Sequence, residues 1–230
     1  MEDVARLAAE HGGPLRFALS HRPPVHEGWV ELLAQGLAFD LVGLSPAAPA
    51  PAPLPRHHYG TPASIALGEA VALRPGAHLS GGENLLPVVR ATAALGSALA
   101  RLDGVEAVVW HPARSASSPA LFCSGVDGWL EGGAFPALAL AALELGEDGS
   151  FRSEGLAFLL GQELRLDSLA DGDSAKAGKI AARLIHTLVE EGALLEAAEF
   201  TGPGGERLRA QPTDNGRVLR VWQIGGVTRQ

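Results

Sequence analysis

The sequence predicts an α+β fold in which helices pack on a mixed or mainly antiparallel sheet. Segments with apolar residues at helical spacing alternate with short apolar runs that favour strands, and neighbouring strands late in the chain indicate a hairpin. Apolar residues make up 47% of the 230 residues, which is enough for one sizeable core or two small ones.

Residues 1–45 are expected to form a small strand–helix–strand unit. A short helix over Asp3–Glu10 precedes Pro14–Ser20, where alternating apolar residues predict a strand. Helical spacing of apolar residues then predicts a helix over Trp29–Leu37, and Phe39–Leu44 favours a second strand.

Residues 46–63 differ in kind, because Pro and Ala dominate them and Pro has no backbone N–H for a ladder. We expect an extended, semi-rigid connector between the N-terminal unit and a main α+β domain at 64–230. A strap that lies across one domain is the alternative interpretation.

The main domain is organised around Ala70–Pro112, which reads as strand, polar loop, helix and strand. Glu69–Ala77 predicts the first of these strands and Val105–Trp110 the second. Between them, Ser80 and Glu83 have the spacing of a capping box, so we expect the long helix to begin there.

Further helices and strands alternate through the rest of the main domain. Ser117 or Ser118 can cap a helix that begins at Pro119, and Ser174–Glu191 carries the apolar stripe of a second strong helix. Leu194–Phe200 and Arg217–Ile224 are expected to form a C-terminal hairpin around a polar, Gly-rich turn. The other predicted strands are Phe135–Leu145, Ser150–Glu154 and Glu163–Asp167.

The loop LSGGEN, at residues 79–84, resembles the signature loop of ABC-type ATPases. That interpretation is rejected, because the chain has no GxxxxGK[ST] loop to hold a nucleotide. The loop is read as a capped helix start, whose free N–H groups offer an anion site as the minority alternative.

His78 and His111 follow the two predicted strands of the organising stretch. If these strands are parallel and joined by the helix between them, both histidines and Glu83 lie at one edge of a sheet. Such a set could bind a divalent metal or act as acid and base, although its spacing matches no ligand motif. The candidate binding rim is therefore His78, Ser80, Glu83 and His111, with no catalytic residue, metal or cofactor assigned.

Composition argues against several classes of function. The net charge is −8 and the Arg residues are scattered, so we expect no nucleic-acid partner and no anionic membrane surface. Cys123 is the single cysteine, which excludes an intrachain disulfide. The acidic N-terminal segment does not predict a signal peptide and no segment predicts a membrane span, so a cytoplasmic location is expected.

Several features between His78 and Asp167 follow one another in a recognisable order. The strand end AH leads into a polar loop and a long helix, AVVWHP ends the next strand, and GLAFLLGQELRL follows the apolar segment after Pro136. In this order they resemble a bacterial family known as domain of unknown function 4261. The resemblance implies the fold but no established activity, and hence no catalytic residues.

We expect a non-catalytic protein-interaction or accessory protein with an unidentified protein partner, because no motif specifies a reaction. Families of this kind often accompany secretion or toxin systems, and an immunity-like role follows by that analogy. The competing hypothesis is a metal- or His-dependent hydrolase that uses His78, Glu83 and His111. A third is a self-assembling subunit that forms a homo-oligomer.

Overall fold

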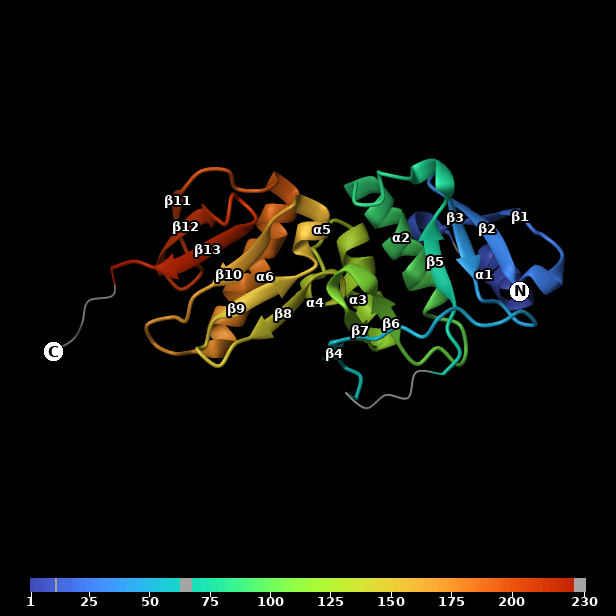
Figure 1. The fold of residues 1–230 in the computed structure, drawn as a ribbon, viewed down its shortest axis with the longest axis horizontal. Coiled ribbons are helices and arrows are strands. Elements are labelled where there is room, and N and C mark those ends of the chain that lie inside the picture. The colour runs from blue at the N-terminus through green and yellow to red at the C-terminus, as the bar shows by residue number, and fades with distance from the viewer. Residues whose placement is uncertain (11, 63–67, 226–230) are drawn as a thin grey trace. The chain divides into compact units, whose positions relative to one another are not determined.

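Helices and mostly antiparallel sheets alternate along the chain, so the predicted α+β fold is confirmed (Figure 1). The structure, a computed structural model, describes residues 1–10, 12–62 and 68–225. The chain divides into two units: the first comprises Met1–His111 and Ala116–Ala134, and the second comprises Pro112–Ser115 and the chain from Phe135 onward.

This division differs from the expected one, which placed the boundary at residues 46–63. The described part of that segment lies inside the first unit, because β3 (Leu37–Val42) pairs antiparallel with β5 (Ala72–Pro75) across it. The helix α2 (Leu86–Leu99) also contributes to the same core as the strands before residue 46. Residue 63 of the predicted connector and residues 64–67 of the expected main domain lie outside the described residues.

The first unit is built on a four-stranded sheet in the order β1-β2-β3-β5. Buried side chains of α1, β2, β3 and α2 form its core. A small sheet in the order β4-β7-β6 completes the set of strands. The elements as far as residue 130 are α1 (Glu2–Glu10), η1 (Gly13–Leu15), β1 (Ala18–His21), η2 (Val25–Glu27), β2 (Trp29–Ala34), β3, β4 (His57–Tyr59), β5, η3 (Ala77–Leu79), α2, β6 (Val108–Trp110), η4 (His111–Ala113), β7 (Ser115–Ser117) and α3 (Pro119–Leu130). Of these, η4 after His111 and the first residue of β7 are assigned to the second unit.

The helix expected over Trp29–Leu37 is wrong, because this segment forms β2 and the turn into β3. Val30, Leu32 and Ala34 are buried and alternate with more exposed residues, which is the period of a strand. Leu33, which helical spacing placed on the buried face, is 42% exposed.

A strand also forms inside the predicted connector. His57–Tyr59 make up β4, which belongs to the small sheet. This short run contains no Pro, so its backbone N–H groups remain able to join a ladder.

The predicted capping box at Ser80 and Glu83 is wrong. The residue before α2 is Leu85, no side chain caps it, and Pro lies in the first turn of the helix. Ser80 instead follows the 3-10 turn η3. The predicted Ser118 cap is confirmed, since its Oγ accepts the Leu121 N–H at 3.4 Å at the start of α3.

The second unit is built on a six-stranded sheet in the order β11-β12-β13-β10-β9-β8. β10 pairs with β13 in parallel, and the other neighbours pair antiparallel. Leucine and valine side chains of β10 and β13 are buried on the face that α6 covers. The elements are α4 (Ala137–Leu140), β8 (Ala142–Leu145), β9 (Phe151–Glu154), α5 (Leu156–Leu160), β10 (Glu163–Leu166), α6 (Ser174–Glu191), β11 (Ala198–Thr201), β12 (Arg207–Thr213) and β13 (Val218–Gln223).

Two predictions for this unit need correction. The apolar run Phe135–Leu145 is divided between the short helix α4 and β8, so it is not one buried strand. The expected two-stranded hairpin contains a third strand, β12, where a polar turn was predicted. The polar residues Arg207, Arg209 and Gln211 made this segment resemble a loop in the sequence. Leu208 and Ala210, which alternate with them, are buried as in a strand.

Candidate functional site

The four residues of the predicted rim do not share one sheet edge. His78 lies in η3 after β5, and His111 begins η4 after β6. β5 belongs to the four-stranded sheet and β6 to the three-stranded one. The premise of two parallel strands in one sheet therefore fails, and with it the geometric argument for a joint site with Glu83 and Ser80.

His78 has a local structural contact. Its Nε2 accepts the backbone N–H of Ala38 at 3.5 Å, next to the end of β5. Within residues 1–10, 12–62 and 68–225, no group of three or more His, Cys, Asp or Glu side chains is placed to hold a metal ion. In the second unit, His186 on α6 likewise accepts a backbone N–H, that of Phe135, at 3.3 Å.

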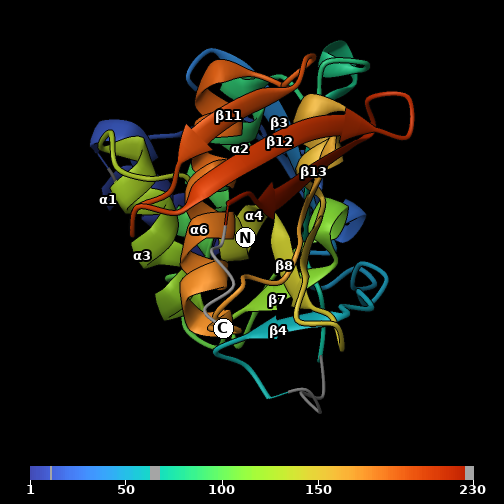
Figure 2. The ribbon, with the colours of Figure 1, turned by 90° about the vertical axis from the view of Figure 1, so that its left-hand side faces the viewer.

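A groove of about 560 Å³ runs along α6 in the second unit. Residues of α6 line one side of the groove, and residues of β11 and of the turn after it line the other. Figure 2 shows β11 and β12 crossing in front of α6. β12 and β13 contribute its floor. The lining residues are Ile180, Arg183, Leu184, Thr187, Leu188, Glu191, Gly192, Ala193, Leu194, Ala198, Phe200, Thr201, Gly202, Pro203, Ala210 and Leu219.

Helical periodicity places one stripe of α6 on this groove. Ile180, Leu184 and Leu188 recur every fourth residue, so they lie above one another on the same helix face. Ile180 and Leu188 are buried, whereas Leu184 is only partly covered. On the opposite side of the groove, strand periodicity places Ala198 and Phe200 on one face of β11, because they alternate with exposed residues.

The groove exists because one helix is too narrow to cover the sheet. Six strands at about 4.8 Å spacing span roughly 24 Å, while a helix is about 10 Å wide. α6 packs against β8, β9 and β10. The groove lies between α6 and β11, where Ala198 and Phe200 are partly exposed, whereas Ala210 and Leu219 beneath it are buried.

A buried ion pair holds the end of the groove near the start of α6. Glu206 is 6% exposed and lies 2.6 Å from Lys176 Nζ, and the Gly204 N–H donates to it at 3.0 Å. The hydrogen bond from Lys176 is the main cause that lowers the pKa of Glu206, and the same contact raises the pKa of Lys176. These bonds fix the turn that carries the lining residues Gly202 and Pro203.

A buried amide holds the other end. Gln162 is 1% exposed, and its Nε2 donates to Leu194 O at 3.1 Å and to Gly216 O at 2.8 Å. Its Oε1 accepts the Leu194 N–H at 3.3 Å. The segment that follows α6 is thus tied to the turn between β12 and β13, so both ends of the groove are fixed before any ligand arrives.

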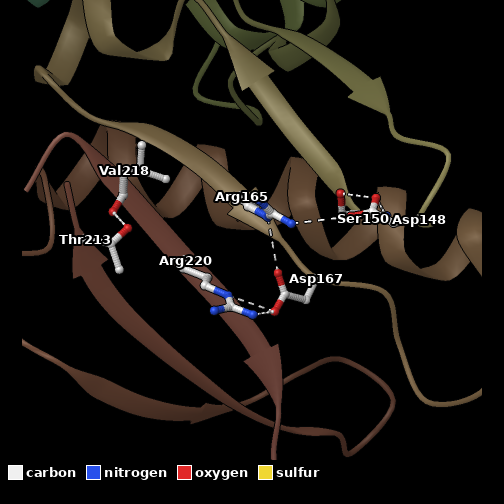
Figure 3. A network of polar contacts seen from close by, with 7 residues as sticks. All are labelled: Asp148, Ser150, Arg165, Asp167, Thr213, Val218 and Arg220. Carbon is white, nitrogen blue, oxygen red and sulfur yellow. Dashed lines mark hydrogen bonds and ion pairs between the residues drawn. The ribbon is translucent and has the colours of Figure 1, made fainter.

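The opposite face of the sheet carries a network of ion pairs (Figure 3). Arg220 Nη2 lies 2.6 Å from Asp167, and Arg165 lies 3.3 Å from Asp148 and 3.4 Å from Asp167. Hydrogen bonds from Ser150 are the main cause that lowers the pKa of Asp148, and the bond to Asp167 raises the pKa of Arg220. These ion pairs tie β10 to β13 and to the turn before β9, although the buried Arg165 Nε and Asp167 Oδ1 have no hydrogen-bond partner among the described residues.

The described residues that line the groove include no His, Cys, Ser or Asp, and its polar side chains are those of Arg183, Thr187, Glu191 and Thr201. The sequence predicted the apolar stripe of α6 but not the groove beside it. The missed signal was the pair Leu194–Leu195, two and three residues after Gly192, since Leu195 is 82% exposed beside the lining residue Leu194.

Comparison of the chain with protein-family models, with curated proteins and with solved structures finds no match. The resemblance of residues 78–167 to domain of unknown function 4261 therefore stays a prediction. In the described part of the chain, none of the helices combines the length and the apolar character needed to span a bilayer.

Proposed function

We propose that this chain is a non-catalytic protein-interaction protein that binds an apolar segment of a partner protein in the groove along α6. The observation that carries the proposal is the groove itself, which is apolar, preformed and open along one helix face. Buried apolar surface with few polar groups is the usual composition of a binding site.

The length of the groove supports a polypeptide segment as the ligand. From Ile180 to Glu191 the α6 wall is roughly 16 Å long at 1.5 Å per residue. That length accepts a row of apolar side chains from one segment. Each fully buried side chain of this kind contributes about 1.5–3 kcal/mol before the costs of association.

The wider cellular role is a separate part of the proposal. A cytoplasmic accessory or immunity-like role rests on the resemblance of residues 78–167 alone. The hydrolase hypothesis has lost its geometric support, because His78 and His111 follow strands of different sheets.

Photo-crosslinking tests the proposal. A photoreactive amino acid is placed at Thr187, which is exposed and lines the groove, and in a control at Lys179, which is exposed on the same helix outside the lining. In cells of the source organism we expect Thr187 to crosslink to one segment of one protein, identified by mass spectrometry. The Lys179 control should not give this product.

A matched pair of substitutions completes the test. Leu184→Glu places a charge in the groove and should abolish the Thr187 crosslink, whereas Leu138→Glu, on α4 outside the lining, should leave it unchanged. Equal crosslinking from both positions, or a small apolar molecule retained in native mass spectra in place of a protein, would overturn the proposal.

A further inference from the structure

We infer that the partner segment binds as an extended strand along the free edge of β11, with every second side chain on the groove side. This inference rests on the proposed function and adds the conformation of the ligand and the part of the protein that its backbone contacts. Among the described residues, two features of β11 support it: backbone groups without hydrogen bonds at its edge, and apolar side chains that line the groove.

Only alternate residues of β11 direct their backbone groups toward β12. The Gly202 N–H donates to Glu206 O at 2.7 Å, and these two residues continue the register of β11 with β12. Hydrogen-bonded pairs alternate along an antiparallel ladder. Phe200 is therefore bonded to β12, whereas the N–H and C=O groups of Glu199 and Thr201 point away from it.

The four outward backbone groups form no hydrogen bond within the described part of the chain, and β11 is the end strand of its sheet. Glu199 and Thr201 are two residues apart, which is about 6.8 Å along a strand. An extended segment presents donors and acceptors at this same spacing and can bond to all four groups. A helix uses its backbone groups internally, so it cannot satisfy them.

The edges of the four-stranded sheet carry features that hinder strand addition, and β11 does not. The register of β1 shifts between Leu19 and His21, and two prolines follow this strand. β5 ends at Pro75, and a bridge between Ala50 and Ala70 lies just before it. Irregular register, prolines and covering segments are common means of protecting a sheet edge. By contrast, β11 contains no Pro or Lys and pairs with β12 in an uninterrupted register.

Ion pairs on the outer face of the sheet hold β11 in place. Glu199 lies 3.2 Å from Arg207 and 3.6 Å from Arg209, both on β12. A segment that pairs with β11 therefore meets an edge that is already ordered, which lowers the entropy cost of binding.

Side-chain alternation connects this edge to the groove. Successive side chains of an added strand point to opposite faces of the sheet. Those on the inner face lie on the same side as Ala198 and Phe200, which line the groove and are partly exposed. The partner segment should therefore carry apolar residues at every second position.

Backbone N-methylation of a bound peptide tests the inference. A displayed library of 12-residue peptides, randomised at all positions, is selected on the full chain. One selected peptide is then synthesised with a single N-methyl group at each position in turn. Because N-methylation removes a donor, we expect about tenfold weaker binding at every second residue of the paired segment, and little change at the residues between. Fluorescence anisotropy measures each affinity.

A substitution in β11 tests the same bonds from the side of the protein. Thr201→Pro removes an outward N–H without removing a bond to β12, and should weaken peptide binding about tenfold. The matched control Thr201→Val keeps the N–H and should bind like the wild type. Circular dichroism checks that both variants are folded, and the N-methyl scan on the wild-type chain depends on neither variant.

The outcomes distinguish this inference from the proposed function. Binding that is lost in Leu184→Glu but shows no period of two in the N-methyl scan would overturn the inference and leave groove binding in place. A period of two with unchanged binding to Leu184→Glu would support strand addition and overturn the proposed groove. A wild-type dimer that Thr201→Pro dissociates would assign the edge to a second copy of the chain and overturn the inference. If no peptide is selected, both proposals are overturned.

Discussion

Single buried polar side chains decide the shape of the candidate site. Glu206 and Gln162 hold the two ends of the groove, and neither was singled out in the sequence. Both lie in polar turns or between elements, where a Glu or Gln is usually solvated. Their roles depend on partners at Lys176 and Leu194, which the chain brings close only after folding.

Glu206 should make the second unit sensitive to acid. Its pKa in the folded protein lies below the ordinary value of 4.5, so its contribution to stability is complete above about pH 4.5. The contribution is lost as the pH falls through the lower, folded-state pKa. Urea unfolding of Glu206→Gln and wild type should show the variant less stable at pH 7, with the gap closing toward pH 3.

Glu196→Gln provides the control for this titration, because Glu196 is an exposed carboxylate of the same unit. Its stability should follow that of the wild type at each pH. A gap between Glu206→Gln and wild type that stays constant down to pH 3 would contradict the assigned ion pair.

At the scale of elements, local signals identified helices better than strands. α3 and α6 were predicted with nearly the observed bounds, because a cap, an N-terminal Pro or a terminal Gly lies within each segment. β2 was read as a helix and β12 as a turn. Both errors arose because the face a strand buries is decided by distant partners, here the strands paired with β2 and with β12.

The contrast between the two predicted caps has a measurable consequence. The Ser118 side chain caps the start of α3, whereas Ser80 ends the 3-10 turn η3 and does not cap the start of α2, although both were predicted as N-caps. Ser118→Ala should lower the free energy of unfolding by about 1 kcal/mol, as loss of a cap does. Ser124→Ala, on the exposed side of α3, should change it by less, and chemical denaturation monitored by circular dichroism measures both.

At the scale of the whole molecule, the two units carry separate cores. The core of the first joins α1, β2, β3 and α2, and that of the second lies between α6 and its own sheet. Composition allowed two small cores but could not say where the chain divides. The boundary between the units was predicted at the Pro/Ala-rich segment. Pairing of β3 with β5 instead places the strands on both sides of that segment in the same unit.

A destabilising substitution in one core should therefore lower the stability mainly of the unit that contains it. Leu32 is fully buried in β2, and Leu32→Ala should destabilise the first unit by about 2–5 kcal/mol. Hydrogen exchange measured by mass spectrometry should show faster exchange in β1–β3 and unchanged exchange in α6 and β10. Uniformly faster exchange in both units would show that they unfold together.

The place of β13 in its sheet has a consequence for biosynthesis. β13 follows every other named strand in the chain, yet it lies in the interior of the six-stranded sheet, between β12 and β10. During translation, the ribosome must therefore release β13 before the two sides of the sheet can join. Leu219 of β13 also forms part of the groove floor, so the site matures late. A nascent chain that has not yet released β13 therefore lacks this part of the groove floor.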